Sequence, residues 1–161
     1  MTIPFRIDIE LDDQVSAALE RLIGAGEDMS PVMRDISEIL LDQTMENFEQ
    51  EGRPEWQVLA PSTVAERSKH GWWPGKILQR SGQLRSAIAP FSGPLEAGVS
   101  VAMPYGAIHQ LGGFAGRGGA AAIPARPYLP VEAGTDDQLQ AEAEDSIINA
   151  FNKYLLESWE G

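Results

Sequence analysis

The first quarter of the chain has apolar positions with two different periods, which predict a strand followed by a helix. Apolar and polar side chains alternate over residues 5–11, as in a half-buried strand. After Asp12 and Asp13, which can cap a helix, and before Gly24 and Gly26, apolar residues recur at helical spacing, namely at Val15, Ala18, Leu19 and Leu22. The sequence therefore predicts a first helix that ends near residue 24.

A second helix is predicted from Ser30 to about Glu51. Ser30 can cap it, Pro31 is favoured at the first helical position, and Gly52 and Pro54 follow its end. Its apolar face consists of Val32, Ile36, Ile39, Leu40, Met45 and Phe48. The opposite face is acidic, with Asp35, Glu38, Asp42, Glu46 and Glu49.

The middle of the chain has weaker periodicity. A short helix is predicted near residues 62–68, and residues 98–103 alternate like a strand that ends at Pro104. Residues 112–122 are rich in glycine, which loses much entropy on ordering, so they predict a flexible loop. Three prolines predict that residues 123–130 are extended.

A long C-terminal helix is predicted from about Thr135, with Asp136 and Asp137 in its first turn, where carboxylates favour the helix dipole. Its apolar face contains Leu139, Ile147, Phe151, Tyr154 and Leu155. Strands and helices do not alternate as in a doubly wound fold. The whole pattern predicts a single α+β domain over residues 1–161, with two N-terminal helices, a small, mostly antiparallel sheet and a long C-terminal helix.

Composition narrows the class of function. The chain has 161 residues, two histidines and no cysteine, which excludes disulfides, thiolate nucleophiles and cysteine-based zinc sites. His70 and His109 are far apart in sequence and form no metal-binding motif, so neither a metal nor a cofactor is expected. No apolar run suits a signal peptide or a membrane span, so we expect a cytoplasmic protein without a membrane partner.

The formal charge of −12 is unevenly distributed along the chain. Residues 1–51 hold 13 acidic and 3 basic residues, residues 52–131 hold 3 acidic and 8 basic ones, and residues 132–161 hold 8 acidic and 1 basic. Either two solvated acidic helices enclose a core, or acidic ends stack on basic middles of neighbouring subunits. Stacking of that kind would weaken at high salt.

Two further functions are open at this level. His109 is a candidate general base of a hydrolase-type enzyme, but no nucleophile motif accompanies it, and the sequence favours a packed histidine. The basic middle segment could make the chain a nucleic-acid-binding accessory protein. No recognition helix or RNA-binding aromatic pattern occurs, so sequence-specific nucleic-acid binding is not expected.

Aromatic residues on irregular segments are either core plugs or interface anchors. We expect Trp56 to lie in the core and Trp72 and Trp73 to be exposed or interfacial.

Four motifs in the middle of the chain, taken in order, resemble the phage virion morphogenesis family, the tail-completion proteins of Mu-like and P2-like tailed phages. They are GRPEWQVL with the following Thr63, then ILQRSGQLRSAI, YGAIHQLG and IPARPYL. They occupy residues 52–59, 77–88, 105–112 and 123–129. Two departures are Gly106, where the motif commonly has alanine, and a short, tryptophan-rich segment between the first and second motifs.

The resemblance implies a structural protein, not an enzyme, that completes the tail or joins tail to head. It implies ring-like homo-oligomers, contacts with tail-tube, tail-terminator or connector proteins, and a place in the host cytoplasm during assembly and then in the virion. The extended proline segment and the glycine-rich loop suit docking, and Arg126 could pair with a carboxylate. The candidate partner contacts are Trp56, Trp72, Trp73, Tyr105, His109, Arg126 and Tyr128; each could instead pack within its own chain.

Overall fold

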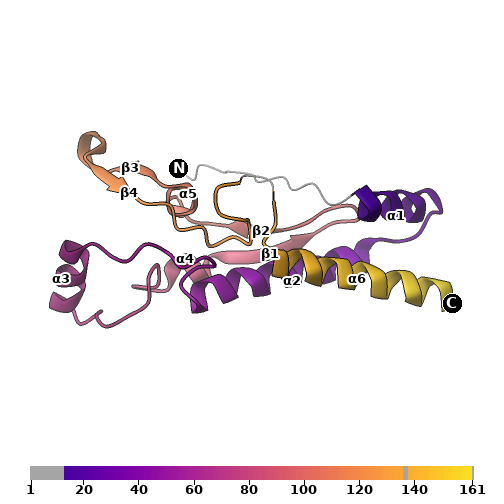
Figure 1. The fold of residues 1–161 in the computed structure, drawn as a ribbon, viewed down its shortest axis with the longest axis horizontal. Helices are drawn as coiled ribbons and strands as arrows, with labels where there is room; N and C mark the ends of the chain where they lie inside the picture. The colour runs from indigo at the N-terminus through magenta and orange to yellow at the C-terminus, as the bar shows by residue number, and fades with distance from the viewer. Residues whose placement is uncertain (1–12, 136–137, 161) are drawn as a thin grey trace. The chain divides into compact units, whose positions relative to one another are not determined.

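The computed structural model describes residues 13–135 and 138–160 (Figure 1). The predicted strand over residues 5–11 lies outside them. The described residues fall into two compact units. We call residues 44–88 and 101–129 the motif unit, because they contain the four motifs, and the remainder the helical unit. The prediction that the chain is one domain stays a prediction.

The α+β fold class is confirmed, with helices first, antiparallel strands in the middle and a long helix last. The strands form two separate two-stranded sheets, β1–β2 and β3–β4. Within the described part of the chain, no helix has the length and apolar character needed to cross a membrane.

Three helices build the core of the helical unit. They are α1 (Asp13–Gly24), α2 (Ser30–Glu49), whose first 14 residues belong to this unit, and α6 (Ala141–Glu160). Their apolar faces bury one cluster, because apolar residues three and four positions apart share one side of a helix. The cluster comprises Leu22, Met29, Val32, Met33, Ile36, Leu139, Ala143, Ile147 and Phe151.

The start of α2 is capped differently from the prediction. The carboxylate of Asp28, not the hydroxyl of Ser30, satisfies a first-turn donor, since the Ser30 N–H donates to Asp28 Oδ1 at 3.0 Å. This backbone hydrogen bond is the main reason why the pKa of Asp28 is lowered.

Helix α6 begins at Ala141, later than predicted, because the chain first folds back on itself. Val131 and Leu139 form an antiparallel bridge, and the Gln140 N–H donates to Pro130 O at 3.0 Å. These contacts use the backbone groups that an earlier helical turn would need.

The hairpin of β1 (Ile88–Ser92) and β2 (Ala97–Val101) is partly predicted. The alternation over residues 98–103 corresponds to β2, while β1 is a strand that the sequence pattern misses. It contains Pro90, which removes a ladder donor and masks a strand in sequence.

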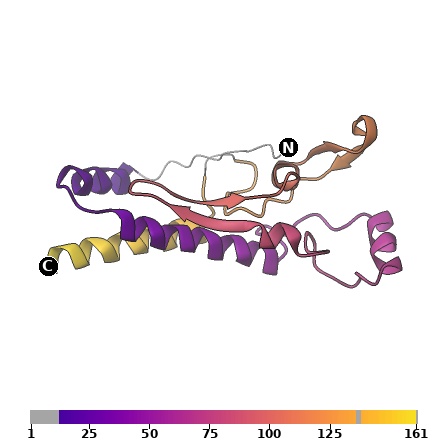
Figure 2. The same cartoon turned by 180° about the vertical axis from the view of Figure 1, so that it is seen from behind.

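The motif unit contains α3 (Pro61–Lys69), which confirms the predicted short helix, α4 (Gln83–Ser86) and α5 (Gly106–Leu111). The glycine-rich segment differs from the predicted loop. It forms an antiparallel hairpin of β3 (Gly113–Ala115) and β4 (Ala121–Ile123), with Phe114 opposite Ala122 and the 3₁₀ turn η1 (Arg117–Gly119) at its tip (Figure 2). Glycines supply the positive φ angles of the tip, and alanines supply the short strands.

We expect Ala143→Leu to destabilise the protein by about 1–3 kcal/mol, because Ala143 is fully buried between packed helices and has no room for three more carbons. Urea unfolding followed by circular dichroism measures this. Ala141→Leu, at the exposed first position of the same helix, is the matched control and should change little. Equal effects of the two substitutions would contradict the packing described here.

Candidate assembly interface

The fourth motif begins in the β3–β4 ladder, where Ile123 pairs with Gly113, and its later residues are held largely by side chains. The N–H groups of Tyr128 and Leu129 both donate to Gln110 Oε1 at 3.0 Å, and Asn47 Nδ2 donates to Tyr128 O at 3.0 Å. The Tyr128 hydroxyl donates to Gly106 O at 2.8 Å. Because Tyr128 is fully buried, these partners replace the water that its polar groups have lost. Burial also raises the pKa of Tyr128, so the hydroxyl keeps its proton.

An aromatic cluster joins the first and fourth motifs to the end of α2. The Phe48 ring lies edge-on to Trp56 at 5.9 Å and tilted against Tyr128 at 5.5 Å. Trp56 Nε1 donates to Pro127 O at 2.9 Å, so its one polar atom is satisfied inside the chain. The prediction that Trp56 is a core residue is confirmed.

Arg126 also binds within the chain. Its Nε donates to Gln57 O at 3.0 Å and one terminal nitrogen donates to Val58 O at 3.3 Å. Its backbone N–H donates to His109 O at 2.8 Å. The side chain is buried, which lowers its pKa, and its partners are backbone carbonyls where we expected a carboxylate.

The second motif is anchored by two carboxylates at the end of α2. Glu49 pairs with Lys76 at 2.8 Å and with Arg85 at 2.5 Å, and Glu51 Oε1 accepts the Ile77 N–H at 2.6 Å. The hydrogen bond from Lys76, followed by that from Arg85, lowers the pKa of Glu49. The first, second and fourth motifs therefore contact the end of α2, and the third is joined to the fourth through Gln110. The sequence gives no signal for Asn47 and Gln110, the buried amides that link them.

His109 lies half-buried beside this core. Its Nδ1 is buried with no hydrogen-bond partner among the residues that the structure describes, and the Tyr105 ring meets it edge-on at 5.7 Å. Burial, and secondly the positive charge of Arg126, lower the pKa of His109. A general base needs a nucleophile and an orienting group, and the described residues place neither at hydrogen-bond distance from Nδ1.

A closed loop carries the two exposed tryptophans. We call residues 68–76 the Trp72 loop. Buried Arg67 donates to Lys76 O at 3.0 Å, which closes the loop, and its own carbonyl accepts the Trp72 N–H at 2.8 Å, which holds the middle of the loop. Trp72 is 40% exposed and Trp73 41% exposed, which confirms the expected exposure of both.

The Trp72 ring is supported from neighbouring positions. The His70 ring stacks on it at 5.0 Å, and the Arg80 guanidinium lies over it at 4.5 Å from the ring centre. Arg80 also pairs with Glu66 of α3 at 3.5 Å. The indole is thereby held at the surface in one orientation, with the Arg80 cation beside it.

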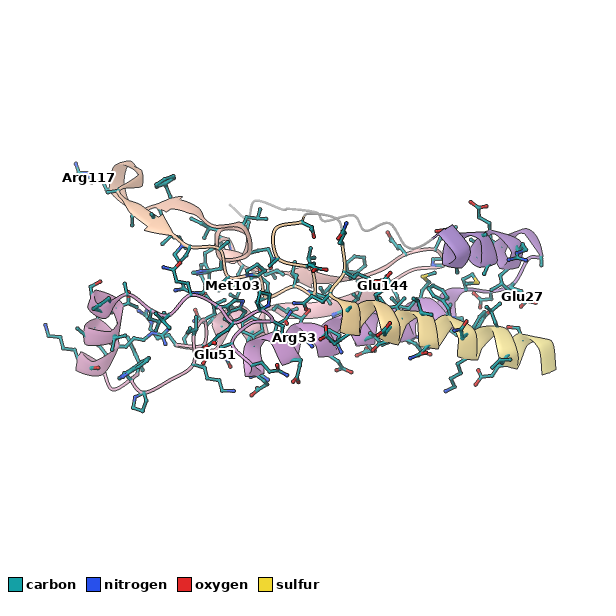
Figure 3. All side chains as sticks on the ribbon, in the orientation of Figure 1. Glu27, Glu51, Arg53, Met103, Arg117 and Glu144 are labelled. Carbon is teal, nitrogen blue, oxygen red and sulfur yellow. The ribbon has the colours of Figure 1, made fainter. Side chains whose placement is uncertain are left out.

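The β3–β4 hairpin is the second exposed feature of the motif unit. Phe114 is 75% exposed, and Arg117 lies at the tip, facing away from the hairpin (Figure 3). A two-stranded hairpin of this length has little stability by itself.

The seven predicted contact residues thus divide by exposure. Trp56, Arg126 and Tyr128 are buried and use their polar groups inside the chain, while His109 is half-buried. Trp72, Trp73 and Tyr105 are exposed. No group of three or more metal-ligating side chains occurs within the described ranges.

Comparison with known proteins shows which family the sequence resembles. The profile of the phage virion morphogenesis family matches residues 11–155. This chain belongs to that family. The protein named "Mu-like prophage FluMu G protein 2" of Haemophilus influenzae is 38% identical over 125 residues, covering 76% of this chain and 83% of the relative. The "Putative capsid assembly protein G" of Escherichia phage Mu is 32% identical over 152 residues, covering 86% and 94%. No solved structure matches.

The departure of this family member at Gly106 has a local explanation. A Cβ atom there would lie 2.8 Å from Val101 Cγ1 and 3.1 Å from the Tyr128 hydroxyl oxygen, whose partner is the Gly106 carbonyl. Glycine lets the start of α5 approach Tyr128 closely.

We expect Gln110→Leu to destabilise the protein by about 3 kcal/mol, because it leaves two buried N–H groups without an acceptor. Chemical unfolding measures the change. Gln57→Leu, on an exposed side chain of the first motif, is the matched control. If the Gln110 variant were as stable as the control, Gln110 would not be the link that holds the fourth motif.

His109 should make stability depend on pH. Because its folded pKa lies below its ordinary value, the unfolded chain binds the proton first as the pH falls, so its contribution is complete above about pH 6.5 and is lost below. The carboxylates Asp28 and Glu49, whose pKa values are lowered, lose their contributions only near and below about pH 4. The urea midpoint of wild type should therefore drop between about pH 7.5 and about pH 5.5, and His109→Gln should reduce the drop. If the urea midpoint of the variant fell as much as that of wild type, another titrating group would be responsible for the pH dependence.

Proposed function

We propose that this protein is a structural virion component that completes the tail or joins it to the head, and that it acts through ring-like contacts between copies. Membership of the virion morphogenesis family supports an assembly role, and the name of the phage Mu relative refers to capsid assembly. Its partners would be further copies of itself and tail-tube, tail-terminator or connector proteins. It would act in the host cytoplasm during assembly and remain in the virion.

The proposal rests on one observation. Key side chains of the family motifs pack inside the chain, whereas several large aromatic side chains of the same unit are exposed. The polar groups of Trp56, Arg126 and Tyr128 are satisfied inside the chain, while Trp72, Trp73 and Phe114 are exposed. Exposed tryptophans on pre-organised loops are typical of binding hot spots, because little entropy is lost when they dock.

The alternative of a hydrolase centred on His109 has less support. Catalysis would require a reactive group beside this imidazole, whereas the Nδ1 atom has no hydrogen-bond partner among the described residues and the backbone carbonyl of His109 accepts the Arg126 N–H of the fourth motif. The family is named for virion morphogenesis and the phage Mu relative for capsid assembly, which favours a role without catalysis.

The proposal is tested in a phage or prophage that lacks the gene. Electron micrographs should show heads and tails that accumulate without joining, and wild-type protein supplied from a plasmid should restore infectious particles. The combined substitution of Trp72 and Trp73 by alanine should lower the titre by at least about tenfold, as expected for interface hot spots.

Val58→Ala, at another exposed apolar position of the motif unit, is the control and should complement normally. Normal joined particles in the complete absence of the protein would contradict the proposal. Failure at an earlier stage, with no heads formed, would assign the protein to head assembly instead.

A further inference from the structure

The helical unit has an apolar groove that the scaffold described above does not use. It lies between α1 and α6, is lined mainly by Leu19, Leu22, Ile148, Phe151 and Leu155, and has a volume of about 240 Å³. Leu22 and Phe151 belong to the core, so the floor of the groove is apolar. This volume is below the range of about 300–1,000 Å³ typical of small-molecule pockets, and it suits one or two side chains of a protein partner.

The charges of the two units are complementary. The described residues of the helical unit include 14 acidic and 3 basic residues, whereas the motif unit has 5 acidic and 8 basic ones. Beside the groove, Asp145 lies three residues before Ile148 on α6, so the two side chains share one side of the helix. The Asp145 carboxylate is exposed and forms no ion pair with another residue in the described part of the chain.

The Trp72 loop offers the matching surface. It combines two exposed indoles with Lys69, which is exposed and forms no ion pair with another described residue, and with Arg80 beside the ring. Aromatic side chains supply the buried area of an interface, and flanking charges supply its orientation and rate of encounter.

We propose that the Trp72 loop of one copy docks into the groove between α1 and α6 of a second copy. Trp72 and Trp73 cover the apolar floor, and Lys69 and Arg80 face the acidic rim that includes Asp145. The interface joins two different surfaces, so a docked pair keeps one free loop and one free groove, and successive copies can close into a ring. The inference rests on the proposed function and names the surfaces through which its ring would form.

Self-association of purified variants tests the docking. Sedimentation velocity at low salt should show oligomers of the wild type that dissociate as salt is added. Trp72→Ala with Trp73→Ala removes the loop contact, and Asn152→Arg puts a long cation into the groove that Asn152 lines. Each change should weaken association by at least about tenfold. Asn149→Arg, on the same helix but outside the groove lining, is the matched control and should associate as wild type.

Mixing the two defective proteins gives the sharpest result. The loop variant keeps an intact groove and the groove variant keeps an intact loop, so their mixture should form dimers and nothing larger. Absence of dimers in the mixture would overturn the inference, as would normal assembly of either variant. If Phe114→Ala abolished assembly and the tryptophan substitutions had no effect, the contact between copies would be made by the β3–β4 hairpin. That result would also overturn the inference.

Cross-linking gives a second measurement, which traps the contact covalently and so does not depend on how long the complex lasts. The chain has no cysteine, so Lys69→Cys and Asn152→Cys introduce single reactive thiols. When the two variants are mixed with a short bifunctional maleimide, a cross-linked dimer should form. Glu38→Cys on α2 replaces Asn152→Cys in the control mixture, which should give much less dimer.

Failure of this inference can be told apart from failure of the proposed function. Wild type that stays monomeric at every concentration would overturn the docking between copies, whereas particle joining in the complementation experiment is scored independently. If the loop and groove variants no longer associated but still restored infectious particles, association between copies would not be required for joining heads to tails.

Discussion

The structure of the motif unit depends on the hydrogen bonds that one buried tyrosine makes with its polar groups. Tyr128 lies in a segment whose prolines remove donors and prevent a regular ladder, yet it sits in the centre of the core. Its N–H, carbonyl and hydroxyl groups each need a partner, and these partners come from α2, α5 and the backbone at Gly106. Gln110 serves two backbone donors with one oxygen, so a single side chain fixes the path of two residues.

This constraint explains why the other motifs lie where they do. With the fourth motif fixed, Pro127 O receives the Trp56 indole N–H and Arg126 reaches back to the carbonyls of the first motif. The buried cation is stabilised by carbonyl dipoles, and removal of those partners would leave a charge in an apolar site. The exposed parts, the Trp72 loop and the β3–β4 hairpin, can vary in contacts without altering this core.

Much of the fold is predictable from the sequence, because the long helices have clear apolar periods. The helices at residues 13–24, 30–49 and 61–69 agree closely with the pattern. Sequence patterns do not predict three elements correctly. Pro90 makes β1 look unlike a strand, and α5 is too short to show a helical period. The bridge between Val131 and Leu139 makes α6 begin later than its apolar pattern predicts. At the site, sequence alone separates Trp56 from Trp72 and Trp73, but it cannot show that Arg126 and Tyr128 are buried, since that follows from partners remote in the chain.

The uneven distribution of charge along the chain has a physical consequence. Acidic residues such as Asp35, Glu38 and Asp42 lie exposed on one helix, three and four residues apart, where like charges repel. In the motif unit the exposed acids Glu49 and Glu66 are instead paired with cations, and these pairs fix the second motif and the base of the Trp72 loop. The repulsion between these carboxylates of α2 is an electrostatic energy that folding of a single chain does not remove. Contact between copies can remove it, because basic groups of one copy can then screen the acidic helices of the next.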